Sequence, residues 1–233
     1  MIKKIVNYFS KLELFLWLNS ATLIISSFVI FGGNGILTLI ASLIGVTAIL
    51  LNAKGNPVGQ ILMIIFSLLY GIISYSFSYY GEMFTYLLMT MPMSVFALIS
   101  WLKHPSKCKK LQVKVNYISK TETIIMFFIA FVVTFCFYFI LKFFNTANIV
   151  PSTISVTTSF VAVYLTFRRN PYFNVAYACN DLVLIVLWTL ASIVDKKYVS
   201  AIVCFVAFLF NDIYGFISWK KLKKEQTDNA DKI

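Results

Sequence analysis

Eight long apolar runs divide this sequence, and they constrain its fold more than any other feature. A helix that crosses a membrane needs roughly 20 mostly apolar residues, and eight segments come close to that length. Short polar or glycine-containing breaks separate most of them, and a longer basic loop, Lys103–Lys120, separates the fourth from the fifth. The segments are Leu14–Phe31, Ile36–Asn52, Val58–Tyr79, Met83–Leu102, Glu122–Phe144, Ile149–Phe167, Tyr172–Val194 and Val199–Trp219.

The composition supports an all-α polytopic membrane protein. Hydrophobic residues make up 60% of the chain, charged residues only 12%, and the mean hydropathy is +0.83, which a soluble domain of this size does not need. The net charge of +11 does not predict a nucleic-acid partner, because the basic residues lie in loops and termini. The four cysteines show no paired spacing and the single His104 lies in a loop. We therefore expect no metal site, no cofactor and no catalytic pair.

The distribution of basic residues predicts the orientation. Lys and Arg collect on the cytoplasmic side of membrane proteins. With the N-terminus inside, eight crossings place 17 of the 20 Lys and Arg residues on the inner side, and only Lys142, Lys196 and Lys197 fall outside. This predicts a multi-pass protein of the inner (plasma) membrane with both termini cytoplasmic. Cys108, in the basic loop, is then cytoplasmic as well.

The chain also repeats itself. Asn56-Pro57 opens the third segment and Asn170-Pro171 the seventh, 114 residues later; Ile-Ser-Trp ends the fourth at Trp101 and the eighth at Trp219, 118 residues later. Two three-helix copies separated by one helix have the same orientation, so we predict parallel repeats. The predicted units are residues 1–34, an extra N-terminal helix; 35–103, the first repeat; 104–147, the basic loop and linker helix; 148–221, the second repeat; and 222–233, a charged, frayed cytoplasmic tail.

The extra helix has no counterpart in the repeat. We predict that it lies at the periphery, away from any substrate path. Its Glu13 and Asn19 then serve to anchor it or to contact another protomer. Assembly into a homo-oligomer stays open at this point.

The seventh segment carries the strongest functional signal. Asp181 has about ten apolar or small residues on either side, and a carboxylate at such a position costs about 2.5–3.5 kcal/mol on insertion scales, so it normally faces a cavity or a partner. At 3.6 residues per turn, Asn174, Tyr177, Asp181 and Trp188 share one face, with Asn180 at its margin. This face suits a flat, polar, cationic small molecule. The alternative is a polar seam that holds helices together.

Other segments offer further candidates. Gln60 in the third segment and Asn211 in the eighth are expected in a cavity, because an unpaired amide in hydrocarbon is costly. Asp212 either lines the cavity or lies near the inner interface, and the sequence leaves both open. Pro92 removes one backbone hydrogen bond from the fourth segment and predicts a kink there.

These motifs, in this order and spacing, resemble the PnuC family of bacterial vitamin-precursor transporters over roughly Ile36–Lys221. The resemblance implies uptake of nicotinamide riboside through a fold like that of the sugar-transporting SWEET proteins, by uniport with phosphorylation trapping the substrate. The carrying residues are Lys54-Gly55-Asn56 with Gly59; Tyr80-Gly81 followed by Tyr86, Pro92 and Trp101; Asn180-Asp181; and Gly215 to Trp219. Tyr86 thereby joins the candidate substrate-binding residues.

One departure from the family pattern bears on the substrate. The family typically carries tryptophans in the seventh helix ahead of its Asn, whereas Asn174 and Tyr177 occupy that region here. Thiamine or another vitamin or nucleoside is therefore the alternative substrate, and a membrane receptor that does not transport is a more distant alternative.

Overall fold

The computed structural model describes residues 8–31, 35–76, 79–106 and 111–230; Cys108 lies outside this part. Within it, eight helical spans are long and apolar enough to cross a membrane, which confirms the predicted fold class. The elements are α2 (Lys11–Phe31), α3 (Ile36–Ala53), α4 (Val58–Ser76), α5 (Tyr80–Phe84), the π-helical turn η1 (Thr85–Thr90), α6 (Met91–Lys103), α7 (Lys120–Phe143), α8 (Ile149–Phe167), α9 (Phe173–Val194), the 3-10 turn η2 (Lys196–Tyr198) and α10 (Val199–Ala230).

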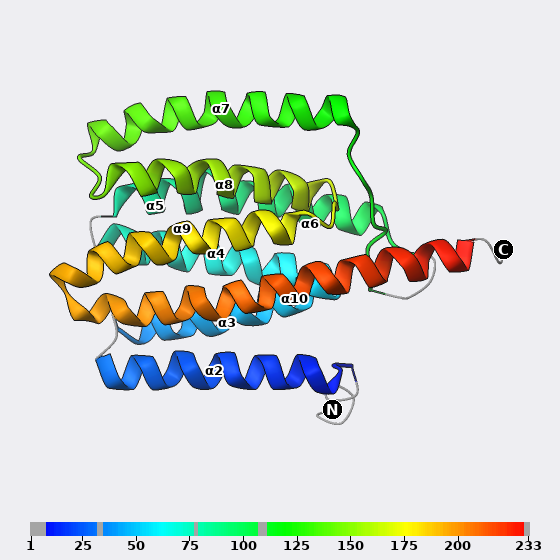
Figure 1. Ribbon diagram of the computed structural model, residues 1–233, viewed down its shortest axis with the longest axis horizontal. Helices are drawn as coiled ribbons and strands as arrows, with labels where there is room; N and C mark the ends of the chain where they lie inside the picture. The colour runs from blue at the N-terminus through cyan, green and yellow to red at the C-terminus, as the bar shows by residue number, and fades with distance from the viewer. Residues whose placement is uncertain (1–7, 32–34, 77–78, 107–110, 231–233) are drawn as a thin grey trace.

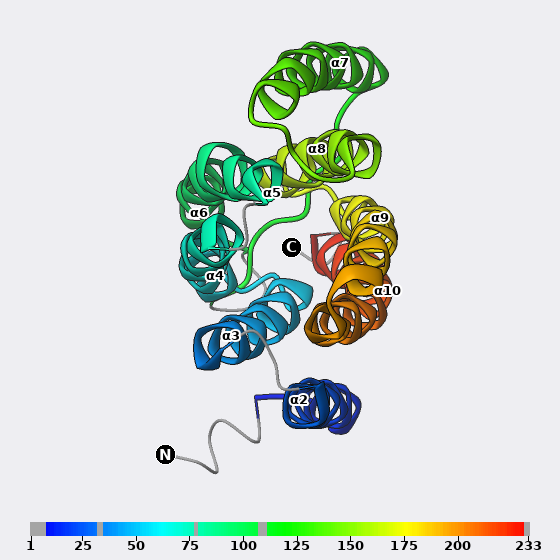
Figure 2. The same cartoon turned by 90° about the vertical axis from the view of Figure 1, so that its left-hand side faces the viewer.

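Six of the helices form a closed ring (Figure 2). Going round it, α3 packs on α4, α4 on α6, α6 on α8, α8 on α9, α9 on α10, and α10 again on α3. The linker helix α7 lies outside the ring against α8, and α2 lies outside it against α3 and α10. Two three-helix halves therefore enclose a shared interior. They meet at two contacts, α3 with α10 and α6 with α8.

The helix α2 is peripheral and is anchored by buried polar contacts. Glu13, only 3% exposed, accepts hydrogen bonds from Lys54 Nζ at 3.0 and 3.1 Å and from the Tyr214 hydroxyl at 3.0 Å. It thus ties α2 to the end of α3 and to α10 within one chain. Asn19 is exposed and donates to the Phe15 carbonyl of its own helix.

The loops before α4 and α9 have the same backbone conformation. Gly55 (φ 66°) and Arg169 (φ 59°) both adopt left-handed angles. The next residue in each loop, Asn56 or Asn170, accepts a hydrogen bond on its side-chain oxygen from the backbone N–H two residues on, at 3.0 Å. Gly55 and Arg169 are 114 residues apart, which is the spacing of the predicted repeat. The two loops therefore support the repeat.

Reciprocal tryptophan contacts join the two halves. Trp101, at the end of α6, donates its indole N–H to the Thr166 carbonyl of α8 at 2.9 Å, and Trp219 of α10 donates to the Asn52 carbonyl of α3 at 2.7 Å. The acceptors are again 114 residues apart. Both indoles are fully buried, and their ring centroids lie 5.5 Å from each other. Each half thus closes on the other by the same bond.

An extended segment, Leu111–Ile118, crosses the end of the bundle at which α2 begins and α10 ends (Figure 1); we call it the strap. Val113 N–H donates to the Gly55 carbonyl at 2.9 Å and Asn116 N–H to the Arg169 carbonyl at 3.0 Å, so the strap bonds both matching loops. The Gln226 side chain accepts from Val115 N–H at 2.9 Å and donates to the Val113 carbonyl at 3.0 Å.

Because Gln226 makes these contacts, the described part of the predicted tail, up to residue 230, is not frayed as we predicted. The helix α10 continues beyond Trp219 to Ala230. Leu222 is buried there, together with Val113 and Val115 of the strap. The sequence prediction failed because it read the charged residues of this stretch as a solvated tail, whereas one face of the helix packs on the strap.

We predict that Gln226→Ala loosens the strap. It leaves Val115 N–H and the Val113 carbonyl without partners, and an unmade buried hydrogen bond costs about 1–3 kcal/mol. Amide exchange of the peptide covering the strap, followed by mass spectrometry, should become faster. The control is Thr227→Ala, which loses only a bond to the Lys223 carbonyl of its own helix. Equal exchange in the two variants would contradict the role of Gln226.

Candidate functional site

The π-helical turn η1 shapes the interior of the first half. It ends two residues before Pro92, whose missing N–H removes one backbone hydrogen bond from the helix, and π-turns are frequent at functional sites. The irregularity predicted at Pro92 thus appears as a wider turn over Thr85–Thr90. Within it, Tyr86 and Thr90 are buried and line a central cavity.

The cavity lies inside the ring and draws residues from both halves. Its volume is about 30 Å³, room for one or two water molecules and far below the roughly 300–1,000 Å³ of pockets that hold small molecules. The protein is therefore closed around its interior. The lining residues are Ile49, Asn52, Met63, Phe66, Tyr86, Thr90, Ser159, Phe173, Tyr177, Asn180, Asp181, Phe205, Phe208 and Asp212.

Two acids give the cavity its electrostatic character. Asp181 of α9 and Asp212 of α10 are 4% and 3% exposed. Oδ2 of Asp181 is buried without a hydrogen-bond partner. None of the lining residues, all of which belong to the described part of the chain, is Lys, Arg or His. The cavity therefore favours a positively charged ligand over a negatively charged one.

Two buried amides add hydrogen-bonding capacity. Gln60 Nε2 donates to Asn52 Oδ1 at 2.9 Å, which leaves the Asn52 amide N–H groups available to the cavity. Gly59 permits this contact, because a Cβ on it would collide with Asn52 Oδ1. Asn180 Oδ1 accepts from the hydroxyls of Thr158 at 2.8 Å and Ser159 at 3.0 Å. Because the oxygens of Asn52 and Asn180 are already bonded and both residues line the cavity, their amide N–H groups are what they can offer a ligand.

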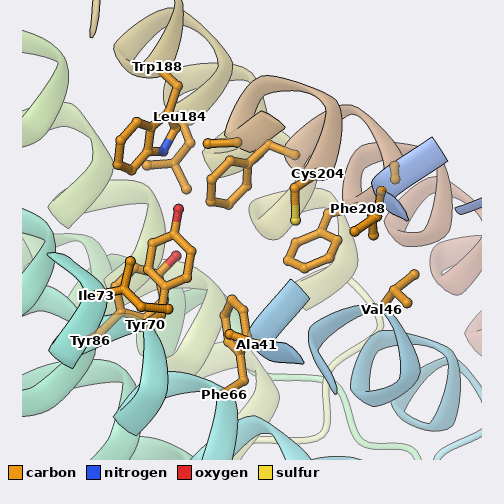
Figure 3. Close-up of a cluster of buried hydrophobic side chains, with 14 of the residues drawn as sticks. Ala41, Val46, Phe66, Tyr70, Ile73, Tyr86, Leu184, Trp188, Cys204 and Phe208 are labelled. Carbon is orange, nitrogen blue, oxygen red and sulfur yellow. The ribbon is translucent and has the colours of Figure 1, made fainter. Parts of the chain in front are cut away.

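Aromatic side chains close the cavity at both ends. Toward the strap, Phe173 packs edge-on against Trp219, with centroids 4.9 Å apart. At the opposite end, Trp188 packs on Tyr79 at 5.0 Å and on Tyr198 at 5.5 Å. Figure 3 shows the cluster between: Phe66, Tyr70 and Tyr86 from the first half face Trp188, Cys204 and Phe208 from the second.

The structure brings four of the predicted residues together in this cavity: Tyr86, Tyr177, Asn180 and Asp181. Gln60 acts one step away, through Asn52. Asn174 and Trp188 share the predicted helix face but do not line the cavity, because 14 residues of helix separate them by about 21 Å. Asn174 instead donates to the Pro171 carbonyl and abuts Gly215, and Trp188 belongs to the aromatic cluster at the far end.

Asn211 points out of the ring. Its amide donates to the Ser20 hydroxyl of α2 at 2.8 Å and to the Ala207 carbonyl at 2.7 Å. Adjacent residues on a helix are about 100° apart, so Asn211 and Asp212 cannot both face inward. The structure turns Asp212 into the cavity, which settles the alternative that the sequence left open.

Asn52, Thr90 and Ser159 line the cavity but were not among the predicted site residues. Asn52 and Ser159 do follow the small and polar spacing of their helices, which also marks helix packing. Because the same spacing fits both roles, the sequence did not identify these two residues as cavity residues. Only the partner of Asn52, Gln60, was distinctive enough to be singled out.

A double-mutant cycle tests the Asn52–Gln60 contact. We expect Asn52→Ala and Gln60→Ala each to destabilise the protein by about 1–3 kcal/mol, since each leaves a buried amide unpaired. The double variant should lose less than the sum, because contacting residues couple by about 0.5–3 kcal/mol. Thermal unfolding in detergent measures this, with Ser76→Ala as an exposed control. Additive losses would show that the two amides act independently.

Comparison with known proteins identifies the family of this chain. A family model described as nicotinamide mononucleotide transporter matches residues 35–221. The chain belongs to this family. It is therefore a membrane transporter and not an enzyme, as the sequence predicted. The helix α2 and the last turns of α10, including Gln226, lie outside the matched region.

Two relatives place the chain more closely. The nicotinamide riboside transporter PnuC of Neisseria mucosa is 24% identical over 202 residues, which cover 85% of this chain and 77% of the relative. A crystal structure of the vitamin B3 transporter PnuC has a TM-score of 0.81 at 23% identity and covers 94% of both chains. The predicted resemblance to the PnuC family is thus confirmed, and the fold is shared almost end to end.

Proposed function

We propose that this transporter family member carries nicotinamide riboside across the inner membrane, into the cell. The observation that carries the proposal is the cavity between the two halves, with its two acids, its two oriented amides and its aromatic walls. The pyridinium ring of the riboside is a flat cation, and its ribose and carboxamide offer hydrogen-bond acceptors. The curated relative named for this substrate supports the proposal.

The charge of the cavity distinguishes the riboside from the mononucleotide in the family's description. A phosphate monoester adds about −1.5 to −2 charge at pH 7, which would lie beside Asp181 and Asp212. No basic residue lines the cavity to balance it. Burying an unpaired charge is costly, so the mononucleotide is disfavoured and the riboside is favoured.

Binding requires the cavity to widen. Phe66 and Phe208 face each other across it with ring centroids 5.8 Å apart, and Tyr86 packs edge-on against Phe66 at 5.8 Å. We propose that these rings separate to admit the substrate, with Tyr177 flanking the pyridinium. A cation over such a ring gains about 2 kcal/mol when desolvated.

Thiamine remains the second candidate. Its thiazolium ring is also a cation, so the same two acids favour it. The seventh spanning helix, α9, has Tyr177 where the family typically has tryptophan. This difference is the reason why thiamine stays a candidate substrate. A binding panel of nicotinamide riboside, its mononucleotide, thiamine and riboflavin on purified protein separates the candidates.

We predict that Asp181→Asn weakens binding of nicotinamide riboside at least tenfold. Loss of a charge-assisted contact costs about 1.5–3 kcal/mol. The reduced riboside, which has the same shape but no ring charge, should lose much less. Titration calorimetry with both ligands measures the difference, and Asp228→Asn on the exposed end of α10 is the matched control. Equal losses for the two ligands would leave Asp181 a structural acid.

The proposal includes the orientation with both termini in the cytoplasm. The loops at Lys54 and Arg168 lie at the same end of the bundle as the strap, in line with the predicted basic inner side. A variant with Cys108 as its only cysteine should resist a membrane-impermeant thiol reagent on intact cells. Lys196→Cys in the cysteine-free background is the control and should react. The reverse pattern would invert the topology.

A further inference from the structure

A second hollow lies beside the ring, where the linker helix α7 packs on α8 next to the strap (Figure 2). We call it the linker groove. Its volume is about 350 Å³, compared with about 30 Å³ for the central cavity, and it falls within the range of pockets that hold small molecules. The lining residues are Tyr117, Ile118, Thr123, Met126, Phe127, Val161, Leu165, Asn170 and Tyr172.

The walls of the linker groove are largely apolar. Met126 and Leu165 are buried, whereas Phe127 is exposed, so the groove opens to the outside of the bundle. Two polar lining residues are already bonded to backbone groups. The Thr123 hydroxyl donates to the Ser119 carbonyl at 2.9 Å, and the Asn170 side-chain oxygen accepts from a backbone N–H at 3.0 Å. The interior of the groove therefore suits a hydrocarbon chain better than a polar ligand.

Two lysines of α10 lie at the edge of the groove. Lys223 Nζ is 6.0 Å from the ring centroid of Tyr117, which lines the groove. Lys220 Nζ is 4.5 Å from the ring centroid of Phe216, and that ring packs on the lining residue Tyr172 at 5.5 Å. Both ammonium groups thus lie within one or two side chains of the opening.

The positive charge at this edge is not neutralised within the described part of the chain. Ion pairs hold Lys54 and Arg168 there, but not the two lysines. Arg169, next to the lining residue Asn170, has a buried Nε without a hydrogen-bond partner. None of the lining residues is acidic. An apolar groove with an unpaired basic edge matches a molecule that is apolar along one part and anionic at its end.

We propose that the linker groove binds an anionic phospholipid of the inner leaflet, with an acyl chain between α7 and α8 and the phosphate beside Lys220 and Lys223. Basic residues at the cytoplasmic ends of spanning helices attract anionic lipids, and basic pockets between such helices bind their headgroups. The proposal rests on the orientation proposed above, which places the strap end in the cytoplasm. It does not depend on the identity of the substrate.

The same charges disfavour a second copy of the chain as the occupant. Two copies in one membrane have the same orientation, so their basic ends lie at the same depth. Each copy has a net charge of +11, and like charges that face each other across an interface oppose association. A lipid brings the opposite charge to this edge.

The test uses delipidated protein in detergent micelles, titrated with phosphatidylglycerol or with phosphatidylcholine of the same acyl chains. Native mass spectrometry counts the lipids bound per chain and reports the oligomeric state. We expect one phosphatidylglycerol per chain, bound roughly tenfold or more tightly than phosphatidylcholine, because two lysines favour the anionic headgroup. Equal affinities for the two lipids would overturn the proposal, and would leave the proposed function standing because no transport is measured.

Charge variants assign the headgroup to the basic edge. Lys223→Gln should weaken phosphatidylglycerol about fivefold and leave phosphatidylcholine unchanged. Lys224→Gln is the matched control, because it removes the same charge from the next, exposed residue of α10. It should keep the wild-type affinity. Equal losses in the two lysine variants would show that only net charge attracts the lipid, and would overturn the assigned position.

Groove variants assign the acyl chain. Phe127→Ala removes part of the groove wall and should weaken both lipids about fivefold, since apolar contact area is lost whatever the headgroup. Phe128→Ala is the control, because Phe128 is exposed on the same helix but does not line the groove. Both side chains are exposed, so neither change should affect folding. Unchanged binding in Phe127→Ala, or an oligomer that binds no lipid and is lost only in Phe127→Ala, would overturn the proposal.

Discussion

Every backbone polar group inside a membrane must find its partner within the protein, and the architecture follows from how this chain meets that demand. The carbonyls of Asn52 and Thr166 already accept a hydrogen bond from the turn that follows them. Each uses its second lone pair for an indole N–H from the other half, Trp219 or Trp101. Two bonds of the same kind thus fix the two halves to each other at one end of the ring.

The strap adds to this constraint at the same end. It carries backbone bonds to Gly55 in one half and to Arg169 in the other, and its valines pack in one buried cluster with both tryptophans. Opening the ring here would leave several polar groups without partners. The opposite end is held by the rings of Tyr79, Trp188 and Tyr198, which are worth about 0.5–1.5 kcal/mol per pair beyond their buried area. A buried hydrogen bond from the Ser155 hydroxyl of α8 to Glu82 of α5, at 3.0 Å, also joins the two halves near that end.

Periodicity and charge predicted the large features and failed on local ones for physical reasons. Apolar length alone fixed the eight spans, and one costly acid, Asp181, marked the cavity. The predicted face of α9 includes the cavity residues Tyr177 and Asp181, but it extends too far, to Asn174 and Trp188. Spacing along the sequence does not say where along its axis a helix meets its neighbours. Asn211 and Asp212 were not separable, because which of two adjacent polar residues faces inward depends on how α2 packs. Asn52 looked like a packing residue until Gln60 was found beside it.

The difference between the two ends determines which way the empty, closed protein opens more readily. At the strap end, hydrogen bonds and buried valines must separate together, and each unmade buried bond costs about 1–3 kcal/mol. At the other end, aromatic rings part without exposing a comparable set of unpaired backbone groups. A cation arriving from the aromatic end then meets Asp181 and Asp212 in the cavity between the two halves.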